Sequence, residues 1–552
     1  MAEYVGIGVS PGRASGRVAR MPEPVAEPPA ETGSADGADS GALIVTACGR
    51  VRDQLLALAA KVSDEGKAIL EAAALMAVDP VLVDGARRRV SASMSPARAV
   101  WEAAEDVAAA LRALDGRVSE RASDVTNVRD RIVAELSGVP PPALPDRPEP
   151  FILIARDLAP ADVVLLDATA CIAVVTADGG PTSHTAILLR SLRLPAIVAA
   201  RGVLELAEDT VVLLDGSAGT VYTNPRAADV ARTRAPVRVR TFDGRGKTAD
   251  GHHVPLMANV GGPSGVAAAV AASAEGVGLF RTEFCFLDRP DAPSIDDQVS
   301  AYRQVLAAFP GQQVVVRTLD AGADKPLPFL DQPAEPNPAL GIRGLRISAH
   351  SEQLLNGQLA AISCAAQQER ADVWVMAPMV STAGEAAAFV AQCDAAGLGT
   401  AGVMVEVPAA ALSAGRILQS ARFASIGTND LAQYTMAADR NTGALADLTD
   451  PWQPAVLQLV QLTCQAGQHL NRPVGVCGEA AADPALACVL VGLGASSLSM
   501  TPQAIPDIAE ALRTVSYDDC IRLAELAVTA AGAREARQSV RAQLPGLAEL
   551  GL

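Results

Sequence analysis

The second half of the chain alternates eight times between a short apolar run and a stretch with helical periodicity. The runs are Val254–Ala258, Val277–Phe280, Val314–Val316, Val373–Ala377, Val403–Val405, Phe423–Ile426, Val474–Val476 and Ser497–Met500. An eightfold strand–helix alternation predicts a (β/α)8 barrel. The apolar runs alone would also suit a doubly wound parallel sheet.

Polar residues follow most of these runs directly, and they favour the barrel. They are Asn259 after the first run, Arg281 and Glu283 after the second, Arg317 and Asp320 after the third, Glu406 after the fifth, Asn429 and Asp430 after the sixth, and Cys477 after the seventh. Catalytic groups of such barrels sit at the carboxyl ends of the strands. The pattern therefore predicts an active site at that end.

Several basic residues belong to the same predicted site. They are Arg281, Arg317, Lys325, Arg343 and Arg440. If they converge, they suit a substrate that carries both a phosphate and a carboxylate. Each of them alone would more commonly be a surface ion pair.

The remaining polar groups suggest further roles. Glu406 and Asp430 suit Mg²⁺, with water and substrate oxygens completing its shell, although ion pairs with the arginines explain the spacing equally well. Asn429 suits a phosphate or carboxylate oxygen. Cys477 suits a proton donor, or it is simply a small buried residue.

A second motif lies before the barrel, in the segment 178–185, where a Gly-Gly turn precedes Thr182-Ser183-His184-Thr185. We expect a helix from about Thr182 to Leu192, with His184 in its first turn. Free N–H groups at such a helix start suit a phosphate, and neutral histidine is a good nucleophile toward phosphorus. The alternative is a helix cap with an incidental histidine.

The first part of the chain predicts a small α/β domain with an insertion. Residues 4–22 and 151–224 contain strand patterns, whereas residues 41–135 have helical periodicity. Proline-rich stretches follow at 23–40 and near 140. Because insertions at exposed loops are physically easy, we expect the helical segment to interrupt the α/β domain.

Composition excludes several classes of protein. The net charge of −17 and the pI near 4.8 argue against nucleic-acid binding through a basic surface. The nine cysteines include no CxxC pair, which argues against a disulfide framework or a cysteine zinc site. No signal peptide or membrane-length apolar stretch is visible, so we expect a cytoplasmic protein with no membrane partner.

At these motifs the chain resembles Enzyme I of the phosphoenolpyruvate:sugar phosphotransferase system nearly end to end. The segments that carry the resemblance are Gly6–Gly12, Gly179–Ala186, Gly278–Phe284, Arg317–Asp320, Gly427–Tyr434, Val476–Glu479 and Leu498–Met500. The resemblance implies a phosphotransferase that moves phosphoryl from phosphoenolpyruvate to its own histidine and then to the carrier HPr, releasing pyruvate in the first step of sugar uptake.

The resemblance also implies roles for individual residues. His184 matches the histidine phosphorylated on Nε2, and Cys477 matches the acid that protonates the enolate. Arg281, Arg317, Arg440 and Asn429 match substrate contacts, to which we add Asp430, Arg343 and Lys325. Glu406 and Asp430 match the Mg²⁺ ligands.

The domains implied by the resemblance follow the sequence pattern. Residues 1–22 and 140–228 would form a swivelling phosphohistidine α/β domain, and residues 41–135 an inserted helical bundle that binds the carrier. Residues 229–250 would be a linker, and residues 251–552 a (β/α)8 barrel that binds phosphoenolpyruvate and forms a homodimer. Ala73 departs from the family pattern, where many relatives have His or Gln, and could alter the choice of carrier.

Three alternatives differ in sequence features. A phosphoenolpyruvate synthase or pyruvate phosphate dikinase also needs an ATP-grasp domain, for which too little chain precedes His184. A regulatory relative without activity would lack a histidine, arginine or carboxylate of the site, and none is missing. An Enzyme I of the nitrogen-related system would carry an N-terminal sensory domain before the Gly6–Gly12 segment.

Overall fold

The computed structural model describes residues 3–550 except 11, 31–36, 63, 92–93, 113–116, 181–183, 193, 227–229, 231–239, 288, 323–326, 331–334, 441 and 443–444. The chain divides into two compact units, Met1–Ala235 and Pro236–Leu552. The boundary between them falls within the stretch 229–250. Each unit is described by itself.

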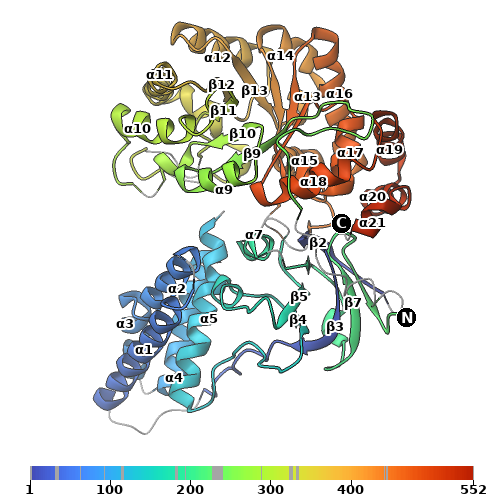
Figure 1. The fold of residues 1–552 in the computed structure, drawn as a ribbon. Helices are drawn as coiled ribbons and strands as arrows, with labels where there is room; N and C mark the ends of the chain where they lie inside the picture. The colour runs from blue at the N-terminus through green and yellow to red at the C-terminus, as the bar shows by residue number, and fades with distance from the viewer. Residues whose placement is uncertain are drawn as a thin grey trace. The chain divides into compact units, whose positions relative to one another are not determined.

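The second unit is a closed barrel of eight parallel strands, so the predicted barrel is confirmed (Figure 1). The strands are β9 Leu256–Val260, β10 Gly276–Arg281, β11 Gln313–Arg317, β12 Asp372–Ala377, β13 Ala401–Val405, β14 Ala424–Ile426, β15 Val474–Val476 and β16 Ser497–Met500. Each strand pairs with the next, and β16 closes the ring by pairing with β9.

Helices surround the barrel strands. They are α9 Val266–Ala271, α10 Ile295–Leu306, α11 Glu352–Gln368, α12 Ala383–Ala395, α13 Pro408–Leu412, α14 Ala414–Ser420, α15 Thr428–Met436, α16 Pro454–Leu470, α17 Pro484–Gly492, α18 Ile505–Leu512, α19 Tyr517–Thr529, α20 Ala533–Ala542 and α21 Pro545–Leu550. Short 3-10 turns lie at η2 Pro263–Gly265, η3 Glu283–Cys285, η4 Pro338–Leu340, η5 Gly344–Ala349, η7 Glu479–Ala482 and η8 Pro502–Ala504. Capping boxes at Ser294 and Thr382 begin α10 and α12.

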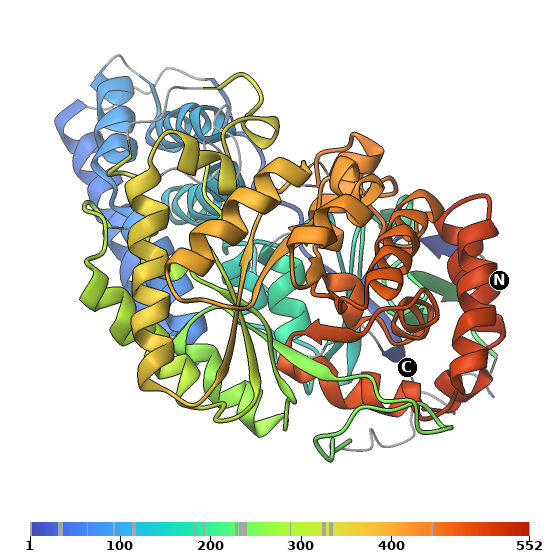
Figure 2. The ribbon, with the colours of Figure 1, turned by 90° about the horizontal axis from the view of Figure 1, so that it is seen from above.

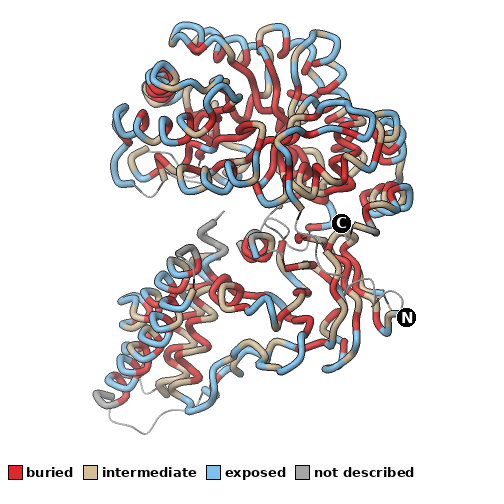
Figure 3. Tube along the Cα trace, in the orientation of Figure 1, coloured by how far each residue is buried: buried red, intermediate tan, exposed pale blue. Residues whose placement is uncertain are grey.

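Two apolar layers hold the barrel together. Both arise because successive side chains of a strand point alternately into the ring and out toward the helices. On β11, Val314 and Val316 join the large cluster that includes the surrounding helices, whereas Val315 joins a smaller cluster inside the ring. The smaller cluster also contains Met376, Met404 and Cys477. Figure 3 shows the strands of this unit as its most continuously buried part. Side chains therefore fill the barrel interior and support the site from below.

The first unit contains an eight-stranded sheet in the order β1-β8-β7-β3-β4-β5-β6-β2. Its strands are β1 Glu3–Val5, β2 Ile7–Ser10, β3 Arg13–Arg20, β4 Phe151–Ala155, β5 Cys171–Thr176, β6 Ala196–Val198, β7 Val211–Asp215 and β8 Thr220–Thr223, with α6 Pro160–Val163, α7 His184–Ser191 and η1 Val203–Glu205 between them. Strands β1 to β3 pair with β8, β6 and β7, so the first residues do complete this domain, as predicted.

A helical bundle is inserted between β3 and β4, which are neighbours in the sheet. Its helices, α1 Gly37–Ala59, α2 Asp64–Ala77, α3 Pro80–Ser91, α4 Pro96–Arg112 and α5 Arg117–Ser137, run side by side in Figure 1 and Figure 2. Their shared core consists largely of alanine, valine and leucine. The buried Asp162 of α6 ties the bundle to the sheet domain, because it accepts hydrogen bonds from Arg131 (3.1 Å) and Asn127 (2.9 Å) of α5.

Among the residues that the structure describes, no helix is long and apolar enough to cross a membrane.

Candidate active site

The carboxyl ends of the barrel strands meet at one side of the ring, here called the barrel mouth, and carry most of the predicted site. These residues are Arg281 and Arg317 at the ends of β10 and β11, Glu406 after β13, Asn429 and Asp430 in the first turn of α15, and Cys477 after β15. All strands of a parallel ring end on the same side. Residues that follow different strands therefore lie close together, although they are far apart in the chain.

Two neighbouring arginines differ in how they are held. Arg281 and Arg317 are register partners on β10 and β11. Arg317 is buried, with its Nη2 2.9 Å from Glu283 Oε1 and its Nη1 3.3 Å from Asp320 Oδ2. Its buried Nε has no hydrogen-bond partner in the described part of the protein. Arg281 is exposed, and no described residue forms an ion pair or hydrogen bond with it. This pair favours an anionic ligand.

Glu406 is a carboxylate almost completely removed from water, with 1% of its surface exposed. Its Oε1 accepts a hydrogen bond of 2.6 Å from the backbone N–H of Met379. Burial, followed by the nearby charges of Asp430 and Asp320, raises the pKa of Glu406 to about 7. A group of this kind is stabilised by a bound cation, since the cation offsets both the burial and the like charges.

The raised pKa of Glu406 predicts a pH-dependent effect of the substitution Glu406→Gln in metal-free protein. The folded state holds this proton up to about pH 7, whereas the unfolded chain releases it near 4.5, so the contribution of Glu406 to stability falls as the pH rises through that window. Glutamine lacks this penalty. We expect the variant to be more stable than wild type by on the order of 2–3 kcal/mol at pH 8, and equally stable at pH 4.

Chemical unfolding at both pH values, in the presence of a chelator, measures this difference. An equal effect of the substitution at pH 4 and pH 8 would contradict the assignment of the titration to Glu406.

Buried ion pairs orient the second carboxylate, Asp430. Its Oδ1 lies 3.0 Å from Nη1 of Arg343, and its Oδ2 lies 3.0 Å from Nη1 of Arg440. Arg343 also binds both oxygens of Asp320 at 3.1 Å and is 1% exposed. The structure therefore shows Arg343 as the residue that holds two carboxylates in place. Its predicted contact with a substrate stays a prediction.

Cys477 lies at the top of the barrel interior, 3% exposed. Its Sγ is 3.6 Å from the carbonyl oxygen of Ile426, which accepts the S–H. Burial raises the pKa of Cys477 to about 11, against the lowering effects of Ser425 and Arg317. The thiol is therefore protonated at neutral pH, as a proton donor must be.

His184 is the first residue of α7. The expected caps Thr182 and Ser183 lie outside the described residues, as does the side chain of His184. The next residue anchors the helix, because the buried Thr185 Oγ1 donates a hydrogen bond of 2.8 Å to the carbonyl oxygen of Leu158. The backbone of residue 184 thus stands at the start of a helix whose position is fixed.

Two predicted residues have different outcomes. Lys325 lies outside the described residues. Asn429 is half-buried, and its Oδ1 accepts a hydrogen bond of 3.2 Å from the backbone N–H of Glu479. This bond joins the ends of β14 and β15, and none of the described residues accepts a hydrogen bond from the Asn429 amide, which leaves its hydrogens for a ligand.

The sequence pattern missed two functional groups. The fourth apolar run has no polar side chain after it, but the structure places the backbone N–H of Met379 there, with a left-handed φ of 60°, as the donor to Glu406. Gln358 on α11 contacts the loops after β10 and β11 from outside the ring. Met379 acts through its backbone, so its side-chain type does not indicate a role in the site. Gln358 lies within a helix, where a glutamine is common and does not indicate such a role either.

The donor set fits Mg²⁺. Within the described residues no three His, Cys, Asp or Glu side chains form a complete metal cluster. Glu406 and Asp430 are both buried, and the negative charge of one disfavours ionisation of the other. Such a pair suits a cation that takes few protein ligands. Glu406 and Asp430 are the residues that would hold it.

Comparison with known proteins finds similarity along most of the chain. Three family models match: "PEP-utilising enzyme, N-terminal" over residues 5–121, "PEP-utilising enzyme, mobile domain" over 147–219, and "PEP-utilising enzyme, PEP-binding domain" over 239–517. PEP stands for phosphoenolpyruvate. The barrel and both parts of the first unit are thus each matched.

Curated relatives match along most of their length. The phosphoenolpyruvate-protein phosphotransferase of Streptomyces coelicolor is 49% identical, covering 98% of this chain and 99% of its own. That of Haloferax volcanii is 40% identical over 85% of both chains. Among solved structures, an NMR solution structure of Enzyme I is 29% identical, with a TM-score of 0.36, and covers 42% of this chain and 96% of its own.

Proposed function

Since the chain belongs to the phosphoenolpyruvate-protein phosphotransferase family, we propose that it phosphorylates its own His184 from phosphoenolpyruvate and passes the phosphoryl group to the carrier HPr. Phosphoenolpyruvate-dependent phosphotransfer follows from the family itself. The phosphorylated residue, the acceptor and the role in sugar uptake are parts of the proposal.

The observation that carries the proposal is the pair Arg281 and Arg317 at the barrel mouth. Phosphoenolpyruvate has a phosphate and a carboxylate on a three-carbon frame, and two adjacent guanidinium groups can neutralise both. Within the described part of the protein, Arg281 has no ion-pair partner and the buried Nε–H of Arg317 has no acceptor. Both features favour an anion that the protein itself does not supply.

The proposed reaction breaks the P–O bond of phosphoenolpyruvate and forms a P–N bond to Nε2 of His184. The enolate left behind takes a proton at its methylene carbon and becomes pyruvate. Cys477, protonated at neutral pH, supplies this proton, and solvent restores it. The arginines stabilise charge that moves onto the leaving oxygen. Mg²⁺ held by Glu406 and Asp430 would supply further charge neutralisation at the phosphate.

The inserted bundle is the proposed docking site for the carrier. Five large apolar side chains on α1 to α3 are exposed, namely Leu43, Val45, Leu56, Leu75 and Val81. Where exposed apolar side chains form one contiguous patch, they commonly mark a protein–protein contact. The chain is strongly acidic, which suits a basic partner. We further propose that the barrel forms a homodimer and that the protein acts in the cytoplasm.

Intact-protein mass spectrometry tests the proposal. With phosphoenolpyruvate and Mg²⁺ but no ATP, we expect a gain of one phosphoryl group, about 80 Da, that acid removes. Added HPr should then take up this mass. A folded protein that binds phosphoenolpyruvate without gaining mass would overturn the proposal. A mass gain that HPr cannot remove would overturn only the choice of acceptor.

A further inference from the structure

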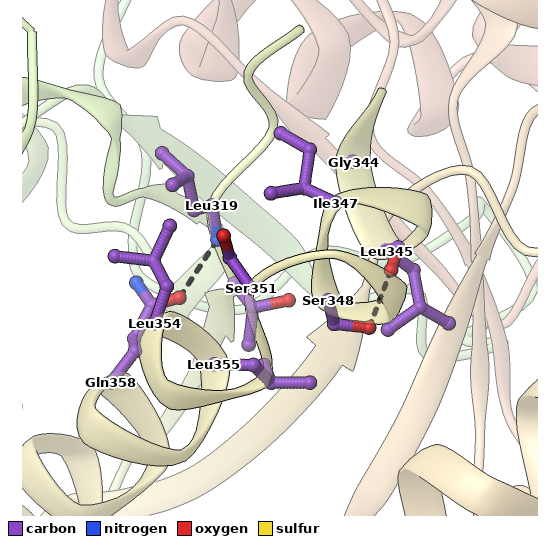
Figure 4. A pocket seen from close by; sticks show the side chains of 10 residues that line it. Leu319, Gly344, Leu345, Ile347, Ser348, Ser351, Leu354, Leu355 and Gln358 are labelled. Carbon is purple, nitrogen blue, oxygen red and sulfur yellow. Dashed lines mark hydrogen bonds between the residues drawn. The ribbon is translucent and has the colours of Figure 1, made fainter. Parts of the chain in front are cut away.

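Gln358 is a buried glutamine outside the ring of strands, and its carboxamide binds three separate segments. It lies on α11 and is 1% exposed. Its Oε1 accepts a hydrogen bond of 2.9 Å from the backbone N–H of Leu319, as Figure 4 shows. Its Nε2 donates to Thr282 Oγ1 at 3.0 Å and to the Tyr302 hydroxyl at 3.1 Å.

Two of these segments carry the arginine pair of the barrel mouth. Thr282 directly follows Arg281, and its Oγ1 donates a hydrogen bond of 2.8 Å to the carbonyl oxygen of Arg317. Leu319 lies two residues after Arg317. One side-chain amide therefore ties together the ends of β10 and β11, and with them the backbone from which both guanidinium groups extend.

The hydrogen-bond directions show why the residue must be an amide. The single hydroxyl hydrogen of Thr282 goes to Arg317, and that of Tyr302 goes to Gln298 Oε1 at 3.0 Å. Both hydroxyls can therefore only accept from Gln358, while Leu319 can only donate to it. A carboxylate lacks the two donors, and an apolar side chain would leave the buried Leu319 N–H without an acceptor and both hydroxyl oxygens without the donor that Gln358 provides.

Packing alone does not hold the Leu319 segment. Thr318 and Leu319 border a small pocket whose other walls come from residues 344–358 (Figure 4). Gln358 lies at the edge of this pocket. Leu319 is itself buried in the barrel core, and the N–H groups of Thr318 and Asp320 donate to the carbonyl oxygen of Met376 and to Glu283 Oε1, so the bond to Gln358 is one of three backbone N–H bonds that fix this segment.

We propose that Gln358 is a positioning residue that sets the spacing of Arg281 and Arg317 for the two anionic groups of the substrate. It touches neither the substrate nor the reacting atoms. The inference rests on the proposed function, in which these arginines bind phosphoenolpyruvate. Small errors of about 1 Å in the placement of such groups can lower rates by about a hundredfold.

The test compares Gln358→Met with Tyr302→Phe in the full-length protein. Methionine has the shape of glutamine but forms none of the three bonds. Phenylalanine removes the buried Tyr302 hydroxyl, and with it the bonds to Gln358 and Gln298, but leaves the link between Thr282 and Leu319 intact. We expect Gln358→Met to raise the KM for phosphoenolpyruvate about ten- to hundredfold, and Tyr302→Phe to raise it less than about threefold. Transfer from already phosphorylated protein to HPr should be unchanged in both.

Equal effects of the two variants on KM, or a change below about threefold in Gln358→Met, would overturn the inference by showing that the network acts only on stability. If Gln358→Met does not fold, Thr282→Val removes the same bridge and should raise the KM in the same way. Calorimetric binding of phosphoenolpyruvate to each variant in a His184→Ala background provides a readout that needs no turnover. Failure of the proposed function would instead appear as absence of phosphorylation in the wild type.

Discussion

Replacing His184 with alanine should abolish the mass gain from phosphoenolpyruvate and stop pyruvate formation, a loss of more than about 10⁴-fold. In the proposed reaction the phosphoryl group passes through a covalent bond to this imidazole, and alanine offers no nucleophile in its place. The barrel and its arginine pair are unaffected by the change, so phosphoenolpyruvate should still bind. Mass spectrometry and a pyruvate assay measure the two losses, and calorimetry measures the binding.

The matched control is His469→Ala, which removes an exposed histidine on α16 of the barrel unit. It should phosphorylate at the wild-type rate. Continued phosphorylation of the His184→Ala protein at another residue would show that a different group receives the phosphoryl group.

The substitution Arg281→Ala should lower kcat/KM for phosphoenolpyruvate by about 10²- to 10⁴-fold. Arg281 supplies a positive charge at the barrel mouth and forms no ion pair or hydrogen bond with a described residue, although the carboxylates of Glu283 and Glu479 act on it from a distance; its guanidinium donors are therefore available to the substrate. Its exposure means that the loss should hardly change stability. Steady-state kinetics of self-phosphorylation and thermal unfolding together measure both parts of the expectation.

Arg281→Lys is the informative companion to this variant. Lysine keeps the charge but loses the planar, forked set of donors, so an intermediate loss is expected. A loss of kcat/KM below about tenfold in Arg281→Ala would place the anion elsewhere on the mouth, because removal of a charge-stabilising donor from the reacting centre costs more.

The barrel could be predicted from the sequence because its signal is local. Each of the eight apolar runs is followed by a stretch with helical periodicity. Every one of the eight runs lies on a strand of the closed ring. The predicted bounds are off by one or two residues at several ends, as for Val254–Ala258 against β9 Leu256–Val260. Hydrogen bonds at strand ends depend on neighbouring strands, which the run itself does not contain.

The site was less completely predictable, because long-range contacts define it. The strand-end rule found the arginines, the carboxylates and Cys477. It did not show that Arg343 would be fully buried between Asp320 and Asp430, since that depends on three loops meeting. It also missed the Met379 backbone donor and the Gln358 amide. Both act through geometry that residue type alone does not reveal.

The inserted bundle has a consequence for the order in which the first unit assembles during synthesis. Strand β3 pairs with β7, and the Ser15 hydroxyl of β3 donates a hydrogen bond to the carbonyl oxygen of Val212 in β7, 197 residues later in the chain. The five helices of the bundle follow one another in the chain and pack on one shared core. The bundle can therefore fold before the partner strands of β1 to β3 have been synthesised. The sheet domain then closes around an already folded insert, and the first strands are among the last parts of that unit to become protected.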